Sequence, residues 1–200
     1  MPVRLSLLLA DAGVAAGISF RTVLPYVLVG ALVLVVLHLL VFRTGSGKAG
    51  RWNWWERLLY LATIVSVAVL AVTSFGALLR YGAVDGWPLF AHMFGAGAFV
   101  AILPLLALTW CEANRFGEPS RAAGGHDSQP RFYWFSKAMY WTLLVAGLVV
   151  TMTMLLSMLP LLGTDGLHTM LAVHRWSGLV VVVVLIFHWY SVLRRRVGAR

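Results

Sequence analysis

Five long apolar runs constrain this chain more than any other feature. A helix that rises about 1.5 Å per residue needs roughly twenty apolar residues to cross the hydrocarbon of a bilayer. The runs cover residues 22–42, 57–80, 88–111, 134–160 and 168–193. The sequence therefore predicts an all-α membrane protein with five transmembrane helices. Because the runs leave no room for a separate soluble domain, residues 1–200 are predicted to form one integral membrane domain.

Composition agrees with a chain that sees lipid rather than water. Hydrophobic residues make up 60% of the sequence and charged residues only 12%, whereas soluble domains are about a quarter charged. The single cysteine, Cys111, excludes a disulfide, a four-cysteine zinc site and an iron–sulfur cluster within this chain.

The N-terminal stretch "MPVRLSLLLADAGVAAGISF" has a basic residue followed by a short apolar run, as a weak signal peptide has. Asp11 interrupts that run early. We expect this stretch to form an interfacial or partly inserted helix that leads into the first span.

Basic residues predict the orientation. The odd-numbered spans end on one side of the membrane, here called side B, and the opposite side is side A. Side A has Arg4, Arg21, Arg80 and Arg175. The other twelve of the sixteen basic residues fall on side B: Arg43, Lys48, Arg51, Arg57, Arg115, Arg121, Arg131, Lys137, Arg194, Arg195, Arg196 and Arg200. The positive-inside rule makes side B cytoplasmic and places the N-terminus outside. The net charge of +9 therefore requires no nucleic-acid partner, since these clusters face anionic headgroups.

Five histidines lie in or beside the apolar runs, and four of them fall at two depths. A polar side chain inside the membrane costs free energy and needs a partner, so each of these histidines is a candidate functional residue. The alternative is that a histidine forms a structural hydrogen bond to a neighbouring helix. His92 and His174 fall near side A, and His38 and His188 fall near side B. His174 and His188 are fourteen residues apart, about 40° short of four turns, so they project from nearly one face with Cα atoms about 21 Å apart. One helix would thus offer an imidazole to each of two stacked sites.

Haem suits this arrangement better than zinc does. Zinc prefers four ligands, usually with carboxylate or thiolate among them, and no acidic residue lies within these spans. Haem iron needs two axial ligands on opposite sides of a flat apolar macrocycle. Gly95 and Gly97 follow His92, and Gly178 follows His174 by one turn. Such small residues would let a macrocycle approach the backbone, or they would serve ordinary close helix packing.

The segments "WPLFAHMFGAGAFVAI" and "HRWSGLVVVVVLIFH" resemble the cytochrome b membrane subunits of respiratory formate dehydrogenase, thiosulfate reductase and nickel–iron hydrogenase. The resemblance covers residues 52–193 and implies a four-helix bundle around two b haems, with the first span as an addition. It implies that His92 and His174 are the axial ligands of an outer haem and that His188 is one ligand of an inner haem.

The inner site departs from the family pattern. In the family, the inner haem's other ligand lies in the first helix of the core, in a stretch like "ERLLYLATIV". In this sequence that position is Tyr60. Three alternatives are open: His38 substitutes from the added helix, the inner haem is absent, or Tyr60 ligates the iron as tyrosine does in catalase.

Other matches are looser. Arg175, beside the outer ligand, is a candidate partner for a haem propionate, and a headgroup contact is its alternative. His168 lies at the outer surface, where a plain interfacial histidine is expected. The family's quinone site lies near "RFYWFSKAMYW", where Lys137 and Trp141 match loosely and Ser136 replaces an expected glutamine.

The expected function is therefore that of a membrane anchor in the bacterial inner membrane. It would carry electrons between iron–sulfur and catalytic subunits on the outer face and the quinone pool, and would be an electron-transfer subunit rather than a catalyst on its own. A stand-alone transmembrane haem reductase is one rival, although such proteins place two ligands on each of two helices. A non-haem membrane anchor with structural histidines is the other.

Overall fold

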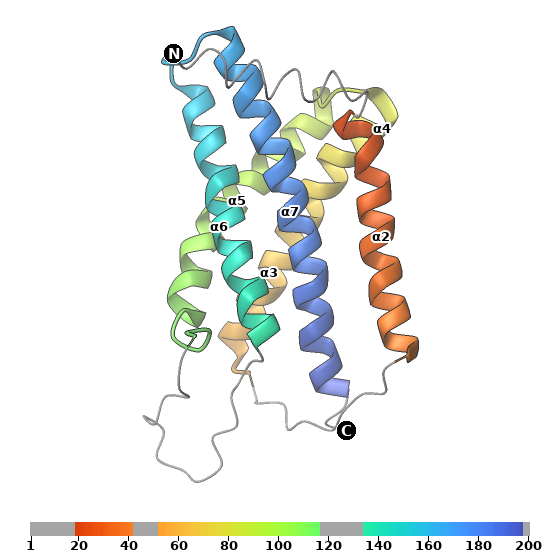
Figure 1. The fold of residues 1–200 in the computed structure, drawn as a ribbon. Coiled ribbons are helices and arrows are strands. Elements are labelled where there is room, and N and C mark those ends of the chain that lie inside the picture. The colour runs from red at the N-terminus through yellow and green to blue at the C-terminus, as the bar shows by residue number, and fades with distance from the viewer. Residues whose placement is uncertain (1–18, 42–51, 117–133, 198–200) are drawn as a thin grey trace.

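The computed structural model describes residues 19–41, 52–116 and 134–197, with side chains described up to residue 193. Its elements are α2 (Phe20–Val41), α3 (Trp54–Ala71), the π-helix η1 (Val72–Gly76), α4 (Ala77–Tyr81), α5 (Gly86–Trp110), α6 (Trp134–Met158) and α7 (Thr164–Val197) (Figure 1). The expected interfacial helix before the first span and the polar loop that contains His126 lie outside the described residues.

Five helices are long and apolar enough to cross a membrane, counting α3, η1 and α4 as one continuous span. Their ends agree with the predicted runs to within four residues. The described part of the chain contains no β-strand. The prediction of an all-α, multi-pass membrane protein is therefore confirmed.

Helices α3, α5, α6 and α7 form a four-helix core, and α2 lies outside it. Helix α6 runs along α7, α3 runs along α5, and α2 packs against α7 (Figure 1). The largest buried cluster joins all four core helices and consists of Val67, Phe99, Leu103, Leu143, Ala146, Val181, Val184 and Leu185. The extra first helix of the prediction is thus a peripheral helix.

The second span starts with a capping box. The Asn53 side chain accepts a hydrogen bond from the Glu56 backbone N–H at 2.8 Å, and the Glu56 carboxylate accepts one from the Asn53 N–H at 3.0 Å. This pair satisfies two backbone donors that a helix start leaves open. The span ends at Gly82, whose φ of 80° is a left-handed conformation that suits glycine.

A π-helical turn interrupts the second span. The hydroxyls of Thr73 and Ser74 donate to the carbonyls of Val69 and Leu70, each at 2.6 Å. Such back-bonding from threonine and serine competes with the regular backbone ladder, and π-turns occur frequently at functional sites. The turn brings Thr73 toward α5, where His92 lies.

Two glycines permit close helix contacts. A Cβ at Gly147 of α6 would lie 2.8 Å from the Leu103 side chain of α5. A Cβ at Gly95 would lie 3.2 Å from Val69 of α3, and the Gly95 carbonyl accepts a hydrogen bond from Ser66 at 3.1 Å. Small residues are a common means of helix association in membranes, where lipid is as apolar as the side chains.

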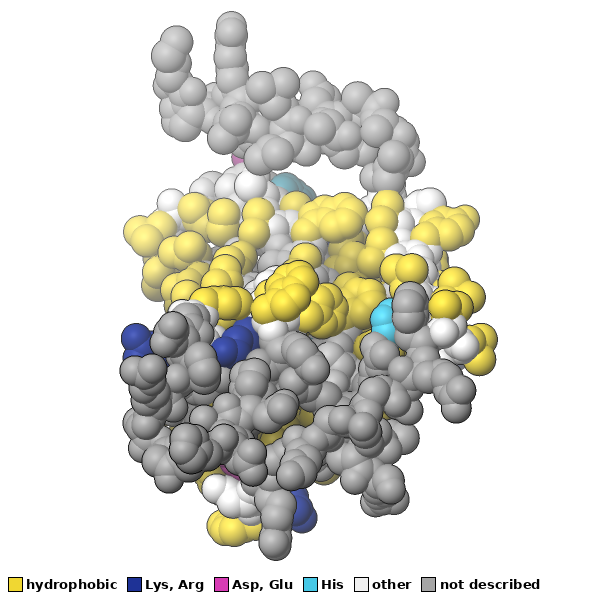
Figure 2. All heavy atoms as spheres, turned by 60° about the horizontal axis from the view of Figure 1, so that its bottom comes forward, with side chains coloured by type: hydrophobic (Ala, Val, Ile, Leu, Met, Phe, Trp, Pro, Cys, Tyr) yellow, Lys and Arg dark blue, Asp and Glu magenta, His cyan; other side chains and the backbone are white. Residues whose placement is uncertain are grey.

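The surface carries a broad apolar belt. Figure 2 shows hydrophobic side chains around the middle of the bundle, with cationic side chains next to the belt on the side-B end. Leu40, Phe94 and Leu108 are each more than three-quarters exposed, as lipid-facing residues are. Of the twelve side-B basic residues, the structure describes the side chains of Arg57, Arg115 and Lys137, so the predicted orientation depends mainly on residues outside the described side chains.

Candidate functional site

The structure brings His92 and His174 together near side A. His92 lies in the second turn of α5 and His174 lies in α7, and both side chains are half-buried. Their ring centroids are 6.4 Å apart with an interplanar angle of 71°. The two histidines that the sequence places at one depth therefore face each other across the core.

A threonine holds each of these rings at Nδ1. Thr73 Oγ1 of η1 lies 3.3 Å from His92 Nδ1. Thr153 Oγ1 of α6 lies 3.2 Å from His174 Nδ1, and the Val150 carbonyl lies 3.3 Å from the same atom. Each histidine is thus held by an element other than its own helix.

The acceptors around Nδ1 favour one tautomer of both rings. Thr73 donates its hydroxyl hydrogen to the Val69 carbonyl, and Thr153 donates its own to the Val150 carbonyl at 2.8 Å. A hydroxyl has one hydrogen, so each Oγ1 then accepts from the imidazole. This pattern favours the tautomer that carries the proton on Nδ1, which would leave the Nε2 lone pairs for a metal.

This pair fits the axial ligands of a haem. With an iron–nitrogen bond of about 2 Å on each side, the two ring centres would be roughly 6 Å apart, close to the 6.4 Å observed. Metal-bound histidines almost always donate their other ring N–H to a neighbouring acceptor, and both rings have a threonine hydroxyl in that position. Within the described residues, no group of three or more histidine, cysteine or acidic side chains could hold a metal ion, so a zinc site of the usual kind has no candidate there.

The two glycines predicted to flank the ligands differ in their surroundings. A Cβ at Gly178, one turn after His174, would meet nothing within 4 Å, although the position is half-buried. Gly95, in contrast, lies against Val69 and Leu70. Gly178 therefore leaves open space one turn from His174, whereas Gly95 serves the contact between α5 and α3.

Two further candidates from the sequence, Arg175 and His168, lie on α7 with His174. Arg175 is half-buried directly after His174. His168 is exposed in the second turn of α7, toward side A. Arg175 is thus a half-buried basic side chain next to His174, and His168 is an exposed side chain of the same helix.

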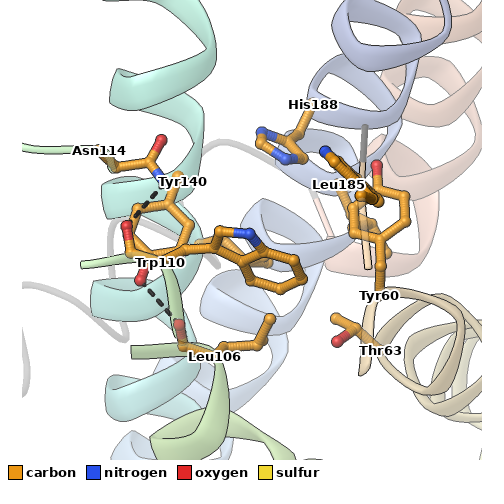
Figure 3. Close-up of a pocket in the computed structure, with 10 residues that line it drawn as sticks. Tyr60, Thr63, Leu106, Trp110, Asn114, Tyr140, Leu185 and His188 are labelled. Atoms are coloured by element: carbon orange, nitrogen blue, oxygen red, sulfur yellow. Dashed lines mark hydrogen bonds between the residues drawn. The ribbon is translucent and has the colours of Figure 1, made fainter. Parts of the chain in front are cut away.

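His188 lies in a different kind of site, near side B. Its side chain is 7% exposed, and its ring lies 6.0 Å from the Tyr60 ring. Tyr60 in turn contacts the rings of Trp52 and Trp110 (Figure 3). The cavity between these residues measures about 20 Å³. Aromatic side chains thus line a cavity smaller than a haem, beside the histidine to which the resemblance assigns an inner haem.

The nitrogens of His188 also differ from those of the outer pair. Nδ1 of His188 has no hydrogen-bond partner among the described residues, whereas Nδ1 of each outer histidine lies beside a threonine hydroxyl. A haem does not fit beside His188 in this packing, because the cavity there measures about 20 Å³.

His38 forms a hydrogen bond and a ring contact with Tyr190 of α7. Positions 188 and 190 are about 200° apart around a helix. His38 has the depth expected from the sequence, but it packs on another side of α7 than the one that carries His188 into the core.

The loosely matched quinone residues take part in helix contacts. Lys137 Nζ donates to the Arg115 carbonyl at 2.8 Å, and Trp141 Nε1 donates to the Asn114 carbonyl at 3.0 Å. Ser136 bonds the hydroxyl of Ser191 at 2.8 Å. Lys137 and Trp141 therefore tie the start of α6 to the segment that follows α5.

Sequence reasoning missed Thr73, Thr153, Trp110 and Asn114. The threonines stand inside apolar spans, and a search for hydroxyl residues at the depth of the histidines would have found them. Trp110 and Asn114 lie close to a span end, where tryptophan is also expected as a membrane anchor. No signal in the sequence distinguishes an inward-facing tryptophan from an interfacial one.

Comparison with known proteins assigns no family, since no family model, curated protein or solved structure matches the chain. The class is defined by the fold and the site alone. It is a multi-pass helical membrane protein with two imidazoles facing each other inside a four-helix core.

Proposed function

We propose that this chain is a cytochrome b membrane anchor that carries electrons between an oxidoreductase partner and the quinone pool. The observation that carries the proposal is the His92–His174 pair, with ring centroids 6.4 Å apart and both Nδ1 atoms on threonine hydroxyls. The partner would bear iron–sulfur and catalytic subunits and would dock on the outer face, which the positive-inside rule assigns to side A.

Each residue at the site has a defined task in this proposal. His92 and His174 supply Nε2 to the iron, and Thr73 and Thr153 hold the rings in the required orientation. Arg175 supplies positive charge for a propionate. Haem held by two imidazoles transfers one electron at a time and has no open coordination position for oxygen. The surrounding apolar helices exclude water from the ligands and so influence the redox potential.

The proposal includes one haem rather than two. The resemblance implies a second haem at His188, with His38 or Tyr60 opposite. The surroundings of His188 do not support it, because the cavity is about 20 Å³ and His38 packs against Tyr190. The loss of the inner haem, one of the three alternatives that the sequence left open, is therefore the proposed state.

A second candidate function is a non-haem membrane anchor in which these histidines are structural. The hydrogen bonds from both rings to threonine favour it, because a buried structural histidine also needs such partners. The two candidates differ in Nε2: structural rings would find protein or water partners there, whereas haem ligands leave both lone pairs facing a common centre.

A visible absorption spectrum of the purified full chain separates the candidates. We expect reduced b-type bands with one haem per chain. His174→Ala should abolish the bands, while His168→Ala, at an exposed histidine of the same helix, should leave them unchanged. A colourless preparation from haem-replete cells would refute the cytochrome proposal, and bands that survive His174→Ala would refute the ligand assignment.

A further inference from the structure

The cavity beside His188 brings together three buried polar atoms that have no hydrogen-bond partner among the described residues. They are Nε1 of Trp110, Oδ1 of Asn114 and Nδ1 of His188. Their residues are 4%, 1% and 7% exposed. Buried polar atoms without partners cost free energy, so three at one cavity call for a ligand that satisfies them.

The chemistry of the three atoms defines that ligand. An indole nitrogen only donates, and the carbonyl oxygen of an asparagine only accepts. One nitrogen of a neutral imidazole donates and the other accepts, so Nδ1 of His188 takes either role. The cavity thus presents one donor, one acceptor and one imidazole nitrogen. A water molecule complements them, because it accepts from the indole, donates to the amide oxygen and pairs with the imidazole in either role.

The size of the cavity agrees with the same ligand. The cavity measures about 20 Å³, and a water needs at least about 10–15 Å³ by this measure. Tyr60 and Trp110 close the cavity on either side, and the indole nitrogen lies on the edge of Trp110 that faces His188 (Figure 3). A planar cofactor or a larger organic ligand has no space in this packing.

We propose that the cavity is a built site for bound water, held by Trp110, His188 and Asn114 in place of an inner haem. The bound water links α5, which carries Trp110, to α7, which carries His188. Asn114 lies just beyond the end of α5 and accepts a hydrogen from the water. This inference does not depend on haem binding at His92 and His174.

Water-edited NMR of the full chain in lipid nanodiscs, with ¹⁵N in its indole and backbone nitrogens, tests the site. The Trp110→Phe variant identifies the Trp110 signal by its loss. We expect transfer of magnetisation from water to the Trp110 N–H in the unmodified chain and no transfer to the backbone N–H of Phe99, which lies 2% exposed in the apolar core. A dry Trp110 N–H, or a second haem per chain that depends on His188, would overturn the proposal.

The His188→Phe variant tests the second partner of the water. An apolar ring fills the cavity and removes the imidazole nitrogen, so water transfer to the Trp110 N–H should be lost. Undiminished transfer in a folded variant would show that His188 takes no part. If this variant fails to fold, Asn114→Leu removes the amide oxygen instead. We then expect a weaker transfer of magnetisation from water to the Trp110 N–H. Unchanged transfer would count against the site.

Thr73 and Thr153 support a second inference, which depends on a different observation and rests on the proposed function. Each hydroxyl donates its hydrogen to a backbone carbonyl and is positioned to accept from an imidazole Nδ1–H. A hydrogen bond at this nitrogen raises the basicity of the ligand and favours the oxidised metal. We infer that Thr73 and Thr153 are positioning residues that hold both ligands as Nδ1–H tautomers and lower the haem potential.

Valine and serine variants test this inference. Valine has the shape of threonine without the acceptor, and serine restores the hydroxyl. In the haem-loaded chain, Thr73→Val and Thr153→Val should each shift the midpoint potential to more positive values, and the serine variants should restore it. A potential unchanged by both valine variants would overturn the role.

A measurement on the haem-free full chain separates this inference from the proposed function. Nitrogen-15 shifts of labelled histidines report which ring nitrogen carries the proton. We expect the Nδ1–H form at His92 and His174, and Thr73→Val should produce a mixture of tautomers at His92 alone. An Nε2–H form in the unmodified chain would refute the threonine role even if haem binds, whereas a correct tautomer in a chain that takes up no haem would refute only the proposed function.

Discussion

His92 and His174 face each other with ring centroids 6.4 Å apart, although they belong to the third and fifth spans. Neither ring is held by its own helix alone. Thr73 of η1 fixes the first ring and Thr153 of α6 fixes the second. All four core spans therefore contribute to one site, with two spans supplying rings and the other two supplying the acceptors that orient them.

The first prediction concerns the number of haems. His92→Ala should reduce the haem content from one per chain to none, because a single imidazole loses its opposite ligand. His38→Ala and His188→Leu should leave it at one, because His38 contacts Tyr190 and His188 faces a cavity of about 20 Å³. Pyridine haemochrome assay against chain concentration measures the ratio. A lower haem content in a folded His38→Ala or His188→Leu variant would support an inner haem and contradict the prediction.

Counting along the sequence was enough to predict the five spans and the shared depth of His92 and His174. The length of the apolar runs gives the spans, and the helical rise gives the depth of each histidine. The sequence did not predict Tyr190 as the partner of His38. Depth alone does not say which side of α7 the first helix packs against. The role of Gly95 was ambiguous for a similar reason: a glycine near a ligand serves either a cofactor or a neighbouring helix, and its contact with Val69 decides for the helix.

The second prediction uses the open space at Gly178. A leucine there would fill the region one turn from His174, where a Cβ meets nothing within 4 Å. We expect Gly178→Leu to reduce haem content strongly while the chain still folds. Gly97→Leu is the matched control, since Gly97 is exposed and a Cβ there also meets nothing. Equal haem content in the two variants would contradict a macrocycle beside Gly178.

The third prediction concerns the contact between α5 and α6. A methyl group at Gly147 would lie 2.8 Å from Leu103 and 3.1 Å from Phe99. Overpacking of this kind costs about 1–3 kcal/mol, so Gly147→Ala should lower the melting temperature in detergent. Gly30→Ala on α2, where a Cβ meets nothing within 4 Å, should leave the melting temperature unchanged or raise it, since alanine favours a helix by up to about 1 kcal/mol. Differential scanning fluorimetry compares the two, and equal shifts would argue against close packing at Gly147.

The fourth prediction concerns orientation and uses the only cysteine of the chain. Cys111 is exposed directly after Trp110, at the side-B end of α5. Because the basic residues make side B cytoplasmic, a membrane-impermeant maleimide should label Cys111 in inverted vesicles and leave it unlabelled in right-side-out vesicles. Thr164→Cys in a Cys111→Ser background places the thiol at the exposed start of α7 on side A, and it should show the opposite pattern. Labelling of Cys111 from outside would reverse the topology and would place the His92–His174 pair near the cytoplasm, where a partner on the outer face could not reach it.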